Sequence, residues 1–406
     1  MNNVDNVEEQ KDSLDWLKSL QKNSWEPEVI ISGIILAFIF IFPAKIYNFS
    51  AALVQDYGVN FIGGWLILLY LSFVINVFKI FFILHLCLRF AWAGLLGVSY
   101  AFPKGVIQEN LFDYSKGLEY RNPTDLVLRL ERICSMAFGI PLLLALVFIP
   151  FTVYLIVLIT IYKVLDLDFL IIYFIFLFTV IAYAVYGILA RNTKINRSSA
   201  KSVYGSLTAI YTSNIGKWKV NVYFLVIIIF TIPFIIADTK GFFLFFHETN
   251  LKNDDIEWPE KSWYFQSFKE KEQRFSRILL PKEEIANSQL KVYLAYYRDD
   301  EDYIKTLASN FKTTLDTLQW KALAFPPDLY RFHLDDSVLV THDWRKTVLP
   351  GTSQKAYETN FDVSQVKAGY HTLRVEKLAL RMRFFDDGEP RHRKNWAVVT
   401  VFKPDE

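Results

Sequence analysis

The sequence predicts a membrane protein with about five transmembrane helices, followed by a mainly-β domain. Two observations lead to this prediction. Up to Ala237 the chain consists largely of Ile, Leu, Phe, Val and Tyr, and from Asp238 onward charged residues recur every few positions. Beyond Gln289, apolar and polar side chains alternate in short runs. In a chain of 406 residues, such a sharp change of composition marks a boundary between domains.

Several apolar runs in the first part are long enough to cross a bilayer. Roughly 20 helical residues cross the ~30 Å of hydrocarbon in a membrane. A buried helix of a soluble protein can also be apolar on every side, but several such runs in succession favour membrane spans. The runs cover residues 29–46, 61–79, 137–162, 169–189 and 222–237.

The number of spans depends on residues 61–102, which are mostly apolar but carry polar side chains. One interpretation is a single span that ends near Lys79 and is followed by an interfacial or re-entrant stretch. The alternative is two spans joined by a tight turn. The polar side chains in this segment are Asn76, Lys79, His85 and Arg89.

The distribution of basic residues favours five spans over six. Lys and Arg accumulate in the cytoplasmic loops of membrane proteins. Residues 103–133 and 190–219 carry several of them, whereas residues 48–58 carry none. Five spans place both basic loops and the N-terminus in the cytoplasm and the C-terminal domain outside it. Six spans would move the N-terminus outside. The abundance of Asn, Lys, Ile and Phe fits an AT-rich bacterial genome, so we expect the bacterial inner membrane.

The N-terminal segment, residues 1–27, is polar and is expected in the cytoplasm. Within it, Leu14, Leu17 and Leu20 recur at helical spacing, and lysines lie beside them. An amphipathic helix of this kind suits an anionic inner leaflet. The alternative is that it packs on the cytoplasmic loops of the same chain.

Alternation of period two predicts strands in the C-terminal domain. Leu290, Val292 and Leu294 alternate with polar residues, as in a strand with one buried face. Residues 299–323 have helical spacing and predict an inserted helix. Asp335-Asp336 and Asp387-Gly388 indicate turns. Further short strands are predicted at residues 330–334, 337–341, 356–362, 371–375 and 396–402.

Residues 361–375 contain an apolar residue, a glycine and an aromatic residue ahead of an alternating strand. This pattern resembles the E–F corner of immunoglobulin-like domains. The resemblance implies that either Tyr370 or His371 fills the corner. Together with the series of short strands, it predicts an immunoglobulin-like β-sandwich with an inserted helix. It implies an architecture and not a function.

These patterns divide the chain into four parts. We expect a cytoplasmic segment at residues 1–27, a transmembrane domain at 28–237, an aromatic and charged connector at 238–285, and an extracytoplasmic β-sandwich at 286–406. The connector either packs on the β domain or provides a docking surface for a partner. The aromatic candidates for docking are Trp258, Trp263, Tyr264 and Phe265.

Two groups of polar residues are candidates for a functional site. Lys79 and Arg89 are ten residues apart, so in a helix they share one face approximately. With Asn76 and His85 they could bind an anion or a lipid headgroup on the inner side, or they could simply extend to the headgroups. The second group could bind a metal ion, although aspartates in this position also favour a turn. It comprises His333, Asp335, His342 and Asp343.

The sequence favours a non-enzymatic protein, because it contains none of the common catalytic or nucleotide-binding motifs, and we expect no cofactor. The helices would contact the lipid bilayer and anchor a domain that binds a partner in the cell envelope. The chain would be a subunit of a membrane complex or a homo-oligomer. A net charge of +2 argues against nucleic-acid binding. The alternatives are a channel or transporter that uses the Asn76–Arg89 group, and a membrane enzyme that acts on a lipid or glycan.

Overall fold

The computed structural model describes residues 25–165, 167–189, 201–245, 260–269, 272–286, 288–320, 323–341, 343–383 and 386–405. The predicted amphipathic segment near the N-terminus, Trp258 and His342 lie outside these residues. The described part of the chain forms two compact units. The first comprises residues 25–42 and 73–234, and the second comprises residues 43–72 and 235–405.

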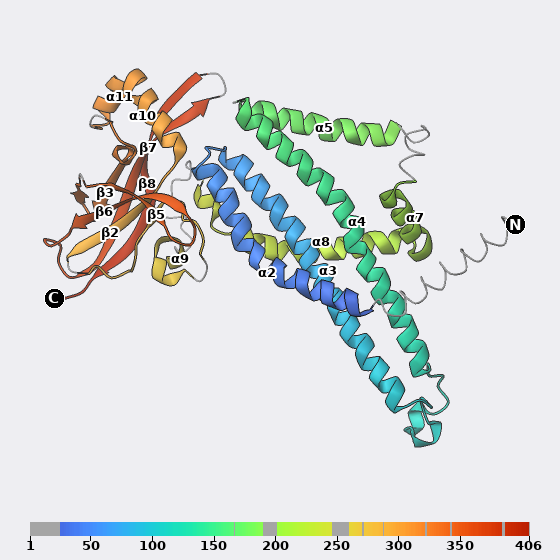
Figure 1. The fold of residues 1–406 in the computed structure, drawn as a ribbon. Coiled ribbons are helices and arrows are strands. Elements are labelled where there is room, and N and C mark those ends of the chain that lie inside the picture. Colours follow the sequence, from blue (N-terminus) through green and yellow to red (C-terminus); the bar gives the residue numbers. More distant parts are fainter. Residues whose placement is uncertain are drawn as a thin grey trace. The chain divides into compact units, whose positions relative to one another are not determined.

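Five helices in the described residues are long and apolar enough to cross a membrane, as predicted. Their apolar side chains are largely exposed, as expected for helices that contact lipid. These helices are α2 (Trp25–Gln55), α3 (Phe61–Ala101), α4 (Pro123–Val164), α5 (Phe169–Leu189) and α8 (Lys217–Thr239), and the shorter α7 (Val203–Ile215) precedes α8 (Figure 1).

The segment whose span number was open is one continuous helix, α3. It contains no proline and has 41 residues, so it is about 60 Å long, about twice the thickness of the hydrocarbon. The stretch beyond Lys79 is therefore neither re-entrant nor a second span joined by a turn. It continues the same helix until Pro103 follows, and a proline disfavours helical geometry in the residue before it.

Helices α3 and α4 run alongside each other toward their connection, as Figure 1 shows. Helix α4 begins with a cap, because the Asn122 side chain accepts a hydrogen bond from the Thr124 amide and Pro123 occupies the first turn. The apolar centre of this unit joins α3, α4 and α8. Its buried members are Val77, Ile80, Phe81, Ile140 and Ile227.

The β domain consists of two antiparallel sheets of four strands each. Their orders are β1-β2-β6-β5 and β4-β3-β7-β8. Helices α10 (Arg298–Asn310) and α11 (Lys312–Thr317) lie between β2 and β3 in the chain. The strands are β1 (Ile278–Leu279), β2 (Gln289–Ala295), β3 (Tyr330–Leu334), β4 (Ser337–Leu339), β5 (Arg345–Leu349), β6 (Gln354–Asp362), β7 (Gly369–Arg383) and β8 (Asp386–Lys403).

Most of the predicted strands are confirmed, with differences at their ends. The strand predicted at 330–334 has the observed bounds, and the Asp335-Asp336 turn joins it to β4. The predicted helix at 299–323 is two helices, α10 and α11. The turn predicted at Asp387-Gly388 is wrong, because both residues lie in β8. Strands β1 and β5 were not predicted.

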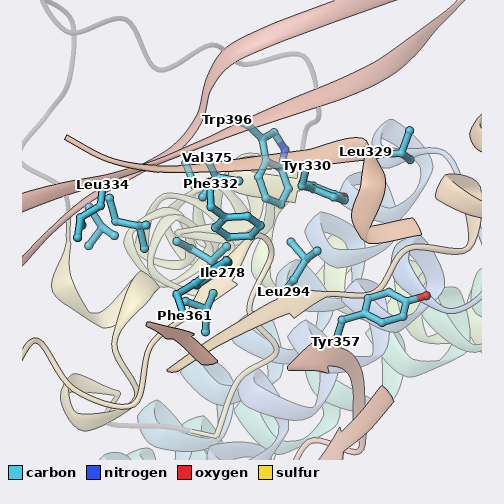
Figure 2. Packing of buried hydrophobic residues seen from close by; sticks show 14 of the residues in the cluster. Ile278, Leu294, Leu329, Tyr330, Phe332, Leu334, Tyr357, Phe361, Val375 and Trp396 are labelled. Carbon is cyan, nitrogen blue, oxygen red and sulfur yellow. The ribbon is translucent and has the colours of Figure 1, made fainter. Parts of the chain in front are cut away.

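The two sheets share one hydrophobic core. Phe332 of β3 and Phe361 of β6 bring the sheets together, with ring centroids 5.1 Å apart. Trp396 of β8 packs on Tyr330 at 4.9 Å between centroids. Figure 2 shows these rings with aliphatic side chains of both sheets around them. Burial of such alternating apolar residues is the main force that holds a two-layer β domain together.

The second unit also contains the ends of α2 and α3 that are joined by the residues between Gln55 and Phe61. A shared apolar cluster packs these helix ends against the β domain. It comprises Ile46, Tyr47, Ala51, Val54, Leu68, Phe242, Phe245, Phe275, Leu279, Ala295, Tyr297 and Ala356. The 3-10 turn η3 (Phe242–Phe245), which follows α8, contributes both of its buried rings to this cluster.

Polar contacts fix the same helix ends to the β domain. The Gln55 amide donates to the Phe275 carbonyl at 2.9 Å. Asn48 accepts from the Arg274 backbone amide at 2.8 Å. The Arg274 guanidinium pairs with Asp56 at 2.8 Å. Because these groups are buried or nearly so, each bond replaces contacts with water that folding removes. The domain is thus packed on the helix ends rather than joined to them by a linker alone.

Candidate functional site

A buried cluster of ionisable side chains joins α2, α3 and α4 in the first unit. Helix α3 contributes His85 and Arg89, which are four residues apart and therefore share one face. Glu28 comes from the first turns of α2, and Glu131 comes from α4. Buried charges in membrane helices are costly and occur where partners neutralise them.

Arg89 is the centre of this cluster. Its Nη1 donates to the Glu131 carboxylate at 3.0 Å, and its Nη2 donates to the Glu28 carboxylate. The guanidinium also lies over the Trp92 ring, 5.5 Å from the centroid. Only 3% of Arg89 is exposed, and its Nε has no hydrogen-bond partner among the described residues. Hydrogen bonds between a charged guanidinium and carboxylates are stronger than those between neutral groups, so the two carboxylates bind Arg89 strongly.

His85 extends the cluster toward α2. Its Nδ1 lies 3.0 Å from the Ser32 hydroxyl, and its Nε2 lies 3.6 Å from the Glu28 carboxylate. The ring also packs on Phe138 of α4, with centroids 5.1 Å apart. An imidazole beside a carboxylate is a pair that can exchange a proton, which makes this the chemically most capable part of the helices.

A small apolar space of about 180 Å³ lies next to Arg89. Its walls are side chains of α2 and α3, namely Val29, Leu86, Phe90, Trp92 and Ala93. Because the walls are apolar, this space suits a hydrocarbon group better than an ion or a sugar.

Asn76 and Lys79 form a separate pair. The Lys79 ammonium donates to the Asn76 side-chain oxygen at 2.7 Å and lies near the rings of Phe40 and Phe234. The structure therefore divides the four predicted residues into two pairs on α3. The acidic partners of Arg89 were not foreseen, because Glu28 and Glu131 lie outside the predicted cores of the spans. The paired spacing of His85 and Arg89 was a signal that counter-charges on other helices were needed.

The predicted aromatic docking residues occupy different environments. Tyr264 and Phe265 are buried in the core of the β domain, so their side chains stabilise that core. Trp263 packs against the same core and borders a pocket described below. A docking role therefore remains a prediction for Trp263, and for Trp258, which lies outside the described residues.

The predicted metal-binding residues that the structure describes have separate partners. Asp335 accepts from the Thr372 amide at 2.9 Å and from His371 Nδ1 at 2.7 Å. These bonds lower the pKa of Asp335, the backbone bond more than the histidine. Asp343 is exposed, and its amide donates to the Thr341 hydroxyl. No group of three potential metal ligands was found among the described residues.

His333 lies beside Glu376, which was not among the predicted ligands. The Glu376 carboxylate is 3.5 Å from His333 Nε2 and 3.0 Å from His392 Nε2. Burial lowers the pKa of His333, and the charge of Glu376 opposes this shift. His392 in turn packs edge-on against Trp320, with centroids 5.2 Å apart. The arrangement ties β3, β7 and β8 together through one carboxylate.

A buried lysine in the β domain was also missed by the sequence analysis. The Lys377 ammonium of β7 donates to the Asp300 carboxylate of α10 at 2.7 Å. The Tyr330 hydroxyl donates to the other Asp300 oxygen at 2.5 Å. The ammonium lies 4.9–5.5 Å from the ring centroids of Tyr297, Tyr330 and Trp396. Burial lowers the pKa of Lys377, and Asp300 opposes this shift.

Comparison with known proteins gave no relative from which a role could be transferred. No family model, no curated protein and no solved structure matches the chain.

Proposed function

We propose that the chain is a non-enzymatic membrane protein whose helices anchor an extracytoplasmic, immunoglobulin-like β domain that binds a partner in the cell envelope. The partner is a protein or a glycan, and the chain is a subunit of a membrane complex in the bacterial inner membrane. The observation that carries this proposal is the packing of the β domain on the ends of α2 and α3. A domain fixed in this way is held at the membrane surface in a defined orientation.

The same packing supports five crossings. The connection between α2 and α3 follows the first span, and the β domain follows the last. Helices α3, α4, α5 and α8 lie between them, which makes four crossings and returns the chain to the same side. If the α3 region formed two spans, the chain would cross the membrane five times between these two parts. The α2–α3 connection and the β domain would then lie on opposite sides of the membrane, although they pack together. Basic residues in the loops then favour the extracytoplasmic side for the β domain.

The outer strands β4 and β5 are where we expect the partner to bind. Among the described strands each pairs with one neighbour, so each is an edge of its sheet. Exposed apolar side chains lie on these strands and on the segment between them, at Val338, Val340 and Val348. Exposed strand edges with apolar side chains are common sites for the binding of another chain.

Site-specific photocrosslinking tests this proposal. A photoreactive amino acid at Val348 should give a covalent adduct in cells, because that side chain is 61% exposed on an outer strand. The matched control is the same substitution at Thr314, an exposed position on α11. The proposal is overturned if neither position gives an adduct and the chain purified from its native membrane is always a monomer without a partner.

A second candidate function is ion or proton transport, and the Arg89 cluster is the observation that favours it. Proton pathways in membranes use carboxylates and histidines that face each other. In proteoliposomes, the variant R89Q should abolish a proton flux that the unmodified chain supports. The control is K45Q, which removes one positive charge from an exposed position of α2. A chain that gives no flux in any variant, or an R89Q flux equal to that of K45Q, excludes the cluster as a pathway.

A further inference from the structure

A polar pocket of about 460 Å³ lies in the second unit, where α8 ends and the β domain begins. Its walls come from α2, from the residues just after α8, from the start of the β domain and from the segment before β1. The residues that define its chemistry are Lys240, Lys269, Arg274, Glu260, Tyr47 and Trp263.

The cations of this pocket outnumber its carboxylates. Lys240 pairs with Glu260, and Arg274 pairs with Asp56. Lys269 donates to the Gln273 carbonyl at 3.1 Å and lies 5.6 Å from the centroid of the Phe275 ring. No ion pair joins Lys269 to a carboxylate among the described residues. Burial lowers the pKa of Lys269 to about 8. A partly buried ammonium without a counter-ion gains stability when an anion binds beside it.

The position of the pocket indicates the type of anion. The apolar span ends at Thr239, Lys240 follows directly, and Tyr47 and Trp263 line the same space. Lysine and the amphipathic rings of Tyr and Trp gather at the depth of lipid headgroups. The phosphate of a lipid headgroup at this depth meets ammonium and guanidinium groups, while the acyl chains of the lipid remain in the hydrocarbon.

We propose that this pocket binds a phosphate group, carried by an anionic lipid headgroup at the membrane surface or present as free phosphate. Lys269 supplies a charge that no carboxylate among the described residues pairs with, Arg274 adds a guanidinium that Asp56 holds in place, and Trp263 forms one wall. This inference depends on the membrane assignment and not on the proposed partner of the β domain.

Lipid quenching of tryptophan fluorescence tests the site in the full chain. The chain is placed in nanodiscs of phosphatidylcholine with increasing amounts of brominated phosphatidylglycerol, and the W263F variant identifies the contribution of Trp263. We expect saturable quenching with phosphatidylglycerol and about tenfold weaker binding in K269Q. The control K305Q removes an exposed lysine of α10 outside the pocket and should bind like the unmodified chain.

A second arm distinguishes the two sources of phosphate. Inorganic phosphate is titrated into the chain in nanodiscs of phosphatidylcholine alone, with thermal stability as the readout. Stabilisation that is lost in K269Q identifies free phosphate as a ligand, whereas an effect of phosphatidylglycerol alone identifies the lipid. If neither phosphate source binds, or if K269Q binds both as well as K305Q does, the proposal is wrong.

The pH dependence provides an independent check. An anion favours the charged form of Lys269, so binding should weaken as the pH rises through about 8, the value to which burial lowers this pKa. The variant K269R should bind with little change over the same range, because a guanidinium stays charged. Equal pH profiles for the unmodified chain and K269R would contradict the role of Lys269.

Discussion

At the scale of single residues, Lys377 shows how this protein buries a charged side chain together with its partners. Lys377 has almost no exposure, yet its ammonium meets the Asp300 carboxylate and three aromatic rings. The attraction within a buried pair offsets the loss of hydration but seldom exceeds it. Such a pair contributes little net stability, whereas the loss of one member leaves a charge without a counter-ion.

The variant K377M should therefore destabilise the protein by about 3–5 kcal/mol, because it leaves Asp300 buried and uncompensated. The combined variant K377M/D300L/Y330F removes all the polar groups of the arrangement and should recover most of that loss. Thermal unfolding of the full chain in one detergent measures both. A triple variant that is no more stable than K377M would show that the ion pair itself stabilises the fold.

Asp335 shows why a predicted metal ligand is better explained by its turn. Its backbone lies in the left-handed region, with φ of 51°, which Asp tolerates better than most residues. Its carboxylate accepts hydrogen bonds from the Thr372 amide and from His371. His371, one of the two residues predicted for the corner, makes this contact, whereas Tyr370 is 74% exposed and packs on Phe402 with ring centroids 4.9 Å apart.

The pKa of Asp335 is lowered in the folded protein, so its carboxylate contributes stability above its ordinary pKa of 3.8 and loses that contribution as the pH falls through the lower, folded value. We expect D335N to lower the free energy of unfolding by about 0.2–1 kcal/mol at neutral pH, as for an exposed ion pair. The difference from the unmodified chain should shrink below pH 3.8. Unfolding measured from pH 3 to 7 checks this, and a difference that is constant over that range contradicts it.

At the scale of elements, the close approach of α2 and α3 depends on a glycine. A Cβ added at Gly64 of α3 would lie 2.5 Å from the Val54 side chain of α2 and 3.5 Å from the ring of Phe242. Small residues allow such close approach of helices in membrane proteins. The same contact positions the helix ends that support the β domain.

The variant G64A should therefore destabilise the protein by about 1–3 kcal/mol through overpacking. The matched control is G94A in the same helix, where nothing lies within 4 Å of the added Cβ. Since alanine favours a helix more than glycine does, G94A should be neutral or stabilising. Thermal unfolding in the same detergent compares the two, and equal effects would contradict the packing argument.

The helices and strands could be predicted where the pattern of neighbouring residues in the sequence is enough to indicate them. Hydropathy indicated all five apolar helices, and alternation indicated β2, β3 and β6, because each has a face that is buried. Strand β5 has exposed and half-buried residues only, so it gives no such signal. Partners that are distant in the sequence, such as Arg89 with Glu28 and Lys377 with Asp300, follow from tertiary contacts that one sequence does not reveal.

At the scale of the whole molecule, we propose that the chain has five spans and carries its β domain on the side opposite to its N-terminus and to the α3–α4 connection. Five helices that are long and apolar enough to cross a membrane, and the packing of the β domain on the α2–α3 ends, support this proposal. The identity of the partner has no comparable local signal, because binding depends on a surface shape assembled from separate strands.

Cysteine labelling tests this topology most directly. In a C87S/C134A background, single cysteines replace Lys116 in the α3–α4 connection or Tyr370 on the β domain, both of which are exposed. A maleimide that does not cross membranes is applied to spheroplasts. We predict that Y370C is labelled at once and that K116C is labelled only after the membrane is permeabilised. Labelling of both positions from the same side would contradict it.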